Sequence, residues 1–154
     1  KYLRIDKSSA GCDQKEADVH LGKGRIARER LDVTIVSIGS ILSEAVIASE
    51  ALTKYGVNAR VITLNSLKPF DEAIIFDACR DTGGLIAIEE HVEIGGLAGS
   101  IAEACLTAGI TPKFFHRIGL RDEYPTIVGD QNYLRAAYNL NSESIMSTIL
   151  AALR

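Results

Sequence analysis

Cysteine, positive charge and long apolar runs are all scarce in this sequence of 154 residues. The three cysteines, Cys12, Cys79 and Cys105, are too few and too scattered for a disulfide framework, which favours a reducing, cytoplasmic location. No apolar stretch approaches the roughly 20 residues that span a bilayer, and the N-terminus lacks the pattern of a signal peptide. With a formal net charge of -3 and no basic tract, the chain is expected to bind neither nucleic acid nor a membrane.

The common ligand-binding and catalytic motifs are absent as well. The turn after the first long strand reads IGSILSE, with Gly39 alone, and lacks the spaced glycines of a dinucleotide site. No P-loop, GxSxG or CxxC sequence occurs, so nothing supports these nucleotide-binding, hydrolase and redox classes. The histidines, His20, His91 and His116, show no HxH or HExxH spacing, and we therefore predict no metal site.

A regular alternation of strand and helix patterns is what the sequence does contain. Its length and its 47% hydrophobic content suit one domain with a single sizeable core. The alternation predicts an α/β fold, with three α/β/α layers and a mostly parallel sheet of about five strands. The expected strands, of which the first lies at an edge, are Gly22–Glu29, Asp32–Ser40, Asn58–Leu64, Leu85–Glu89 and Lys113–Gly119.

Local signals mark the helices between and after these strands. Ser40 and Asp71 are expected to cap the first two helices, and Gly56 and Gly109 are expected to stop the first and third. The expected helices are Ile41–Leu52, one from Asp71 to Arg80, one that ends before Gly109, Asn132–Tyr138 and Ser142–Leu153.

The first twenty residues differ from the rest. The chain begins with Lys1 rather than methionine, and the following YLRI has the pattern of a strand, so we infer a fragment of a longer protein. The polar run DKSSAGCDQKEAD has the composition of an exposed interdomain linker. The compact domain is therefore expected to begin near His20.

The most distinctive run is IAIEEHVEIGGLAGSIAEA. An apolar, interior strand ends there at Glu89, Glu90 and His91, on the strand edge where α/β sheets usually meet ligands and partners. A turn at Gly95 and Gly96 then opens a helix with free amide groups. An anion or a neighbouring subunit could dock at this turn.

This run also has ordinary structural interpretations. Glycine-rich turns pack helices on sheets in many α/β domains, and no Lys or Arg lies between Arg80 and Lys113 to favour a phosphate. His91, beside two carboxylates, could be a general base or a hydrogen-bonded structural residue. The residues alone leave these alternatives open.

Four segments, in one order, carry a resemblance to a known family. They read IVSIGSILSEAVIASEAL, ARVITLNSLKPFDEAII, GGLIAIEEHVEIGGLAGSIAEA and RIGLRDEYPTIVG. Over Gly22 to about Ile149, the chain resembles the C-terminal domain of transketolase and related thiamine-diphosphate enzymes. The resemblance implies that residues 1–6 end a pyrimidine-binding domain, that residues 7–19 form a linker and that residues 20–154 form the C-terminal domain.

The resemblance further implies an enzyme whose chemistry lies outside this chain. Transketolases transfer a two-carbon ketol unit between sugar phosphates in the pentose phosphate pathway, and their cofactor supplies the difficult chemistry. Thiamine diphosphate and magnesium are held by domains that this chain lacks. The GDQN at Gly129–Asn132 lacks the second glycine and the distant asparagine of a diphosphate motif. We therefore expect no catalytic residue here and no activity from the chain alone.

Two sets of residues receive roles from the resemblance. Arg4 matches the family's arginine for substrate phosphate, which a guanidinium can bind in bidentate fashion, although a solvent-exposed strand arginine is the alternative. Family members are dimers with active sites between subunits. The second set is therefore expected to contact the preceding domains or the other subunit of a homodimer, and it comprises Glu89, Glu90, His91, Gly95 and Gly96.

Three other identities remain open at this point. Deoxyxylulose phosphate synthase has a C-terminal domain that shares the EEH and GG pattern, whereas RIGLRDEYPTIVG is more similar to transketolase, especially to the separate C-terminal subunits of split transketolases. The β subunits of dehydrogenase E1 are a further option. From a different class, the chain could be a non-catalytic interaction or regulatory module that retains the fold.

Overall fold

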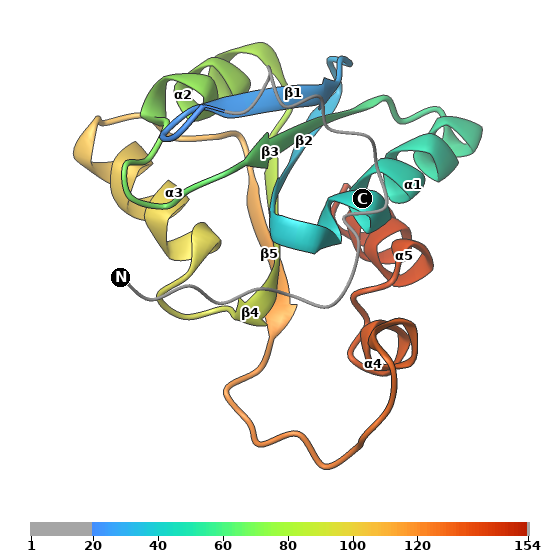
Figure 1. Cartoon of the computed structure of the whole chain (residues 1–154). Coiled ribbons are helices and arrows are strands. Elements are labelled where there is room, and N and C mark those ends of the chain that lie inside the picture. The colour runs from blue at the N-terminus through green and yellow to red at the C-terminus, as the bar shows by residue number, and fades with distance from the viewer. Residues whose placement is uncertain (1–19, 154) are drawn as a thin grey trace.

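The computed structural model describes residues 20–153, which form three layers, with helices on both faces of a five-stranded sheet (Figure 1). The predicted strand in residues 1–6 and the predicted linker in residues 7–19 lie outside this range. The strands are β1 Gly24–Arg28, β2 Val33–Ile38, β3 Ala59–Leu64, β4 Leu85–Val92 and β5 Phe115–Leu120. The helices are α1 Leu42–Leu52, α2 Glu72–Asp81, α3 Leu97–Thr107, α4 Gln131–Ala137 and α5 Ser142–Ala152, with short 3-10 turns η2 Gly39–Ile41 and η3 Thr53–Tyr55.

The sheet has the order β1-β3-β2-β4-β5. Strands β2, β3, β4 and β5 run parallel to one another, and β1 pairs antiparallel with β3 at one edge of the sheet. This topology confirms the predicted fold class and the predicted edge strand. Because parallel strands end on the same side, their last residues define one border, which we call the carboxyl edge. Gly24 pairs with Leu64, so β1 begins beside the end of β3 at this edge.

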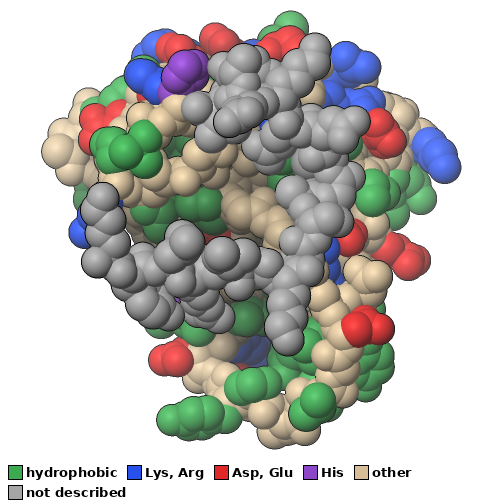
Figure 2. Space-filling view, in the orientation of Figure 1, with side chains coloured by type: hydrophobic (Ala, Val, Ile, Leu, Met, Phe, Trp, Pro, Cys, Tyr) green, Lys and Arg blue, Asp and Glu red, His purple; other side chains and the backbone are tan. Residues whose placement is uncertain are grey.

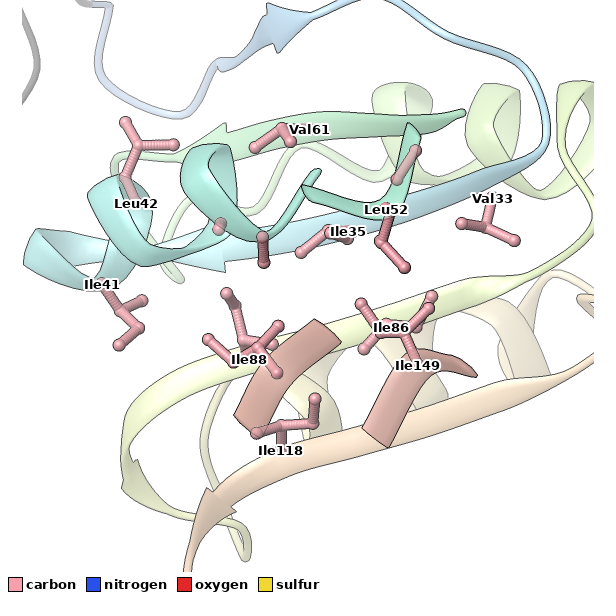
Figure 3. Close-up of a cluster of buried hydrophobic side chains, with 14 of the residues drawn as sticks. Val33, Ile35, Ile41, Leu42, Leu52, Val61, Ile86, Ile88, Ile118 and Ile149 are labelled. Carbon is pink, nitrogen blue, oxygen red and sulfur yellow. The ribbon is translucent and has the colours of Figure 1, made fainter. Parts of the chain in front are cut away.

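Two apolar layers hold the sheet between the helices. One layer packs α1 and α5 against side chains such as Ile35, Ile86 and Ile88, none of which is exposed (Figure 3). The other packs α2 and α3 against Val36 and Ile62 on the opposite face. Alternation along β2 sends neighbouring residues to opposite layers, which is why every residue of this strand but the last is buried. Full burial of each such side chain stabilises the fold by about 1.5–3 kcal/mol.

The predicted helix stops are confirmed, whereas the two predicted helix caps have different outcomes. Gly56 and Gly109 end their helices with positive φ angles of 75° and 67°. Ser40 lies in the η2 turn and donates its hydroxyl proton to Glu90, so α1 begins at Leu42 without a side-chain cap. Asp71 precedes α2, yet its carboxylate accepts a hydrogen bond from the start of β1. The prediction for Ser40 is wrong, whereas Asp71 does occupy the N-cap position of α2 but does not cap the helix with its side chain. Each of the two side chains instead binds a partner that lies far away in the sequence.

Strand β4 extends further than its sequence pattern predicts. The apolar run stops at Ile88, but the strand continues through the two acids and His91 to Val92. It lies between β2 and β5, which confirms the predicted interior position. The acids can occupy the strand because each finds a polar partner, as described below.

Candidate functional site

The carboxyl edge contains the crevice where open α/β sheets usually bind ligands. The chain passes from β2 to β3 on one side, whereas β4 lies on the other side of β2, so the sheet order reverses between β2 and β4. Ser40 follows β2 at this point, and its hydroxyl lies 2.7 Å from the Glu90 carboxylate on β4. The crevice is therefore lined by side chains that bind one another.

The side chain of Arg135, on α4, covers this crevice. Its Nε and Nη2 atoms donate to the two carboxylate oxygens of Glu90 at 2.7 and 2.8 Å, which is the bidentate geometry of a strong ion pair. The Arg135 side chain is 7% exposed and the Glu90 side chain is 26% exposed. Gln131, one turn earlier on α4, also donates to Glu90 at 3.3 Å. The ion pair thus holds α4 against β4.

The surroundings of Glu90 favour its charged form. Partial burial alone would raise the pKa of this carboxyl, but hydrogen bonds from Arg135, Ser40 and Gln131 and the positive charge of Arg135 act in the opposite direction. The balance holds the pKa of Glu90 below its ordinary value of 4.5. Glu90 is therefore ionised at neutral pH and serves as a fixed anion rather than as a proton donor.

The same contacts extend to the C-terminal helix. Glu44 on α1 accepts a hydrogen bond from the Ser142 backbone N–H at 2.7 Å, and its other oxygen lies 3.6 Å from Nη1 of Arg135. We call Ser40, Glu44, Glu90, Gln131 and Arg135 the Glu90 cluster. It joins three separated segments of the chain, namely residues 40–44, Glu90 on β4 and residues 131–135 on α4. Sequence reasoning identified Glu90 alone as a site residue, because no local pattern signals that a residue 45 positions away completes the pair.

Glu89 faces the opposite side of the sheet and has a different partner. Its side chain is buried, and its two oxygens accept hydrogen bonds from the backbone N–H groups of Leu97 and Ala98 at 2.7 and 3.1 Å. These are amides of the first turn of α3, which have no partner within the helix. Gly96 must be glycine because a Cβ atom there would overlap the Glu89 carboxylate. The anion at this helix start is thus the chain's own Glu89.

The remaining residues of the EEH and glycine run face outward. His91 is exposed, and its Nδ1 atom lies 2.7 Å from the carbonyl oxygen of Val92. Gly95 is exposed with a φ of 77°, and Ile94 beside it is 69% exposed. The side chains of His91 and Ile94, together with the exposed Gly95, form the outer surface of the carboxyl edge. Glu89 and Glu90 lie beneath this surface and support it.

Residues 121–130, which we call the projecting loop, extend this outer surface beyond the body of the domain (Figure 1). Tyr124 and Val128 are each 97% exposed. Hydrophobic side chains gather at the corresponding lower end of the space-filling view (Figure 2). Sequence reasoning missed this surface, since the loop contributed only to the family resemblance and its exposure has no local signature.

Two hollows flank the projecting loop. The larger has a volume of about 780 Å³, with apolar walls from Leu120, Ile127 and Leu134, and Glu90 and Arg135 border it. The other has a volume of about 620 Å³ and lies between Tyr138, Tyr124 and Glu93, which directly follows β4. The loop therefore stands away from the domain on both sides.

The described residues contain no cluster of the side chains that most often bind metal ions. No group of three or more His, Cys, Asp or Glu side chains in residues 20–153 could hold a metal. In the GDQN segment, Asp130 accepts from the Tyr133 N–H at 2.8 Å to cap α4, and Gln131 belongs to the Glu90 cluster. Within the same residues, none of the helices is both long enough and apolar enough to cross a bilayer.

Comparison with known proteins places this architecture in a family. Residues 22–145 match the family described as "Transketolase, C-terminal domain". The match covers most of the chain and includes the whole EEH and glycine run, the Glu90 cluster and the projecting loop. The chain belongs to the transketolase C-terminal domain family.

Individual relatives are similar over nearly all of this chain. It is 34% identical over 146 residues to a 6-deoxy-6-sulfo-D-fructose transketolase subunit of Clostridium sp., covering 94% of this chain and 44% of the relative. A putative transketolase C-terminal section from Methanocaldococcus jannaschii is 32% identical, with 99% and 48% covered. A 1-deoxy-D-xylulose-5-phosphate synthase of Desulforudis audaxviator is 32% identical, with 96% and 23% covered. The chain thus spans half or less of these relatives.

A solved structure has the same fold. A split-gene transketolase, described as an "inactive beta4 tetramer", superposes with a TM-score of 0.79 at 30% identity. The alignment covers 88% of this chain and 43% of that protein. The sheet and its helices therefore correspond to one part of a larger transketolase subunit.

Proposed function

We propose that this chain is the C-terminal domain of a thiamine-diphosphate-dependent enzyme that transfers a two-carbon ketol unit between sugar phosphates, as in the pentose phosphate pathway. Family membership over residues 22–145 carries this proposal. It is supported by two relatives whose names describe a transketolase subunit and a transketolase C-terminal section, of which this chain spans 44% and 48%. The chain alone is proposed to be inactive.

The proposed role of the domain is assembly. The outer surface of the carboxyl edge offers His91, Ile94 and Gly95, and the projecting loop adds the exposed Tyr124 and Val128. Exposed apolar side chains gathered at one border are typical of a surface that another protein covers. We propose that the preceding domains, or the other subunit of a homodimer, contact this surface. Glu89, Glu90 and Gly96 would then contribute indirectly, by fixing its shape.

Cofactor and substrate are proposed to bind mainly outside residues 20–153. These residues contain no group of three or more His, Cys, Asp or Glu side chains that could hold a metal, and we propose that other domains hold thiamine diphosphate and magnesium. Arg4, which lies outside the described residues, is proposed to bind the phosphate of the sugar, since its guanidinium can donate to two phosphate oxygens at once. A cytoplasmic location is part of the same proposal.

A second candidate is the C-terminal domain of a deoxyxylulose phosphate synthase. The observation in its favour is the 32% identity to such a synthase over 96% of this chain. The two candidates have the same domain architecture and differ in the reaction of the complete enzyme. The geometry of residues 20–153 therefore does not separate them, and product identity does.

The test is an assay of the complete protein that contains this chain, with thiamine diphosphate and magnesium. One reaction receives xylulose 5-phosphate and ribose 5-phosphate, and the other receives pyruvate and glyceraldehyde 3-phosphate. A seven-carbon ketose phosphate from the first pair supports the main proposal, and deoxyxylulose phosphate from the second supports the alternative. A control without thiamine diphosphate should give neither product. If the loaded protein also gives neither, both enzymatic proposals are overturned and a non-catalytic module is favoured.

A further inference from the structure

The loop that follows β3 holds the chain where it enters the domain. Residues 20–24, which we call the incoming segment, lie against residues 65–71, the β3–α2 loop. The Gly22 N–H donates to the Ser66 hydroxyl at 3.1 Å, and that hydroxyl donates to the Pro69 carbonyl oxygen at 2.6 Å. The Gly24 N–H donates to the Asp71 carboxylate at 2.9 Å. Gly22 and Gly24 of the incoming segment are thus both bound by side chains of the β3–α2 loop.

Asp71 is committed to this contact. The residue is 8% exposed, and a carboxylate at that depth is costly unless charges or hydrogen-bond donors surround it. The donors here come from the incoming segment, since the Lys23 ammonium lies 3.6 Å from its second oxygen. The amide of Asn65 adds a 3.4 Å hydrogen bond to the Lys23 carbonyl oxygen. The start of α2 receives no side-chain cap from Asp71, although the residue stands at the capping position.

Positions 22 and 24 both leave little room for a side chain. Gly22 has a φ of 77°, and a Cβ atom there would lie 2.5 Å from Cγ of Pro69. A Cβ atom at Gly24 would lie 2.6 Å from Cδ2 of Leu64. Two glycines around Lys23 therefore let the backbone lie directly on the loop. The GKG sequence and the loop sequence NSLKPFD are two halves of one contact.

These bonds are additional to those that hold β1 in the sheet. The antiparallel ladder with β3 already covers Gly24 to Arg28, whereas Ser66 binds Gly22, before the strand begins. A contact at that point fixes the direction of the chain rather than the strand itself. It lies at the carboxyl edge, on the same border as the exposed His91 and Ile94.

We propose that this contact is a clamp that fixes the direction from which the preceding residues reach the domain, with Asp71 and Ser66 as its positioning residues. The preceding domain belongs to the proposed function, and in this respect the inference rests on that function. A fixed direction of entry restricts the orientations that the preceding domain can take. It thereby raises the effective concentration of that domain at the carboxyl edge. No new contact between the two domains is needed for this gain.

The first experiment tests the clamp in the 154-residue chain. Amide hydrogen exchange is measured by NMR in the native chain and in the double variant Ser66→Ala, Asp71→Ala. Loss of both acceptors should accelerate exchange at Gly22 and Gly24 by roughly tenfold or more, which corresponds to one lost hydrogen bond. Exchange at the core residue Ile35 should not change. Asp122→Asn in the projecting loop is the matched control, and it should leave both glycines protected.

Gly22→Ala provides a second variant in case the double variant does not fold. It adds one methyl group against Pro69 and leaves Asp71 intact, so it opens the clamp without removing a buried charge. Unchanged protection of the amides at positions 22 and 24 in the folded variant, after correction for intrinsic exchange rates, would overturn the clamp itself.

The second experiment uses the complete protein and has two readouts. Small-angle X-ray scattering should give a broader distribution of interatomic distances in the clamp variants, and kcat for ketol transfer should fall by about tenfold with little change in KM. If exchange accelerates but neither scattering nor kcat changes, the contact only stabilises the end of β1, and the proposal fails. If the native protein shows no ketol transfer, the proposed function fails instead. Amide exchange and scattering still test the clamp in that case, because neither depends on activity.

Discussion

Glu89 and Glu90 are neighbours on β4, yet the two faces of the sheet use them in opposite ways. On the α2 and α3 face, Glu89 binds backbone N–H groups eight and nine residues ahead of it. On the α1 and α5 face, Glu90 binds a guanidinium 45 residues ahead of it. One acid therefore completes a local strand-to-helix turn, and the other joins distant elements. The comparison teaches that two identical side chains can be structural for unrelated reasons.

Both acids differ from the residues that follow them. His91, Ile94 and the projecting loop make few contacts within the described part of the chain and present their side chains outward. Substitutions of Glu89, Glu90 or their partners should therefore lower the stability of the fold, and substitutions of the outward-facing residues should weaken assembly. The predictions below test this division.

Arg135→Met should have the largest effect on stability. It leaves the carboxylates of Glu90 and Glu44 without their guanidinium. Removal of one partner of a buried ion pair costs 3–5 kcal/mol, and the partial exposure of Glu90 places the expected loss at the lower end, about 3 kcal/mol. Urea unfolding at pH 7 measures this loss. Arg121→Met in the exposed projecting loop is the control and should change the free energy of unfolding by less than about 0.5 kcal/mol.

The pH dependence separates the charge of this pair from its packing. Because the pKa of Glu90 is held below 4.5 in the folded chain, its contribution is fully present above pH 4.5 and is lost as the pH falls through the lower folded value. Arg135→Met and Glu90→Gln should each remove the Glu90 contribution to the slope of the stability curve in that acidic range. A curve of unchanged slope in both variants would contradict the assigned ion pair.

Glu89→Gln should have the second largest effect. The amide keeps one acceptor oxygen but loses the negative charge at the start of α3, where the helix dipole favours an anion. A hydrogen bond to a charged group contributes about 1.5–3 kcal/mol, so we expect a loss of about 2 kcal/mol in urea unfolding. Glu103→Gln on the exposed side of α3 serves as the control. Equal stability of the two variants would show that Glu89 does not hold the helix start.

Ile94→Ser with Tyr124→Ser should have the smallest effect on stability, within about 0.5 kcal/mol, because both side chains are mostly exposed. The same change should weaken assembly of the complete protein by about tenfold or more, since buried aromatic and apolar side chains dominate interfaces. Sedimentation over a range of concentrations measures this. The matched control is Tyr55→Ser with Leu106→Ser, which removes exposed side chains that follow α1 and end α3, away from the carboxyl edge. Equal weakening by both pairs would remove the carboxyl edge as the contact surface.

Much of the fold follows from local sequence patterns. Hydrophobic periodicity and glycine stops such as Gly56 and Gly109 predicted every strand and helix of the described residues to within a few positions. The site was predicted less completely. The sequence identified Glu89 and Glu90, but it did not indicate that one is buried under α3 and the other lies beneath α4. Asp71 stands at the predicted N-cap position of α2, but neither its side chain nor that of Ser40 caps a helix, because each binds a partner across the fold instead.

The sequence by itself determined the succession of strands and helices, the carboxyl edge as the chemically distinctive border and the resemblance to the transketolase family. These depend on periodicity and turn residues, which act over a few positions. Only the tertiary structure decided which polar side chains meet: Glu90 with Arg135, Asp71 with Gly24 and Glu89 with the start of α3. Such pairs form because the sheet order brings separate segments to one edge, where a polar group withdrawn from water must find a partner.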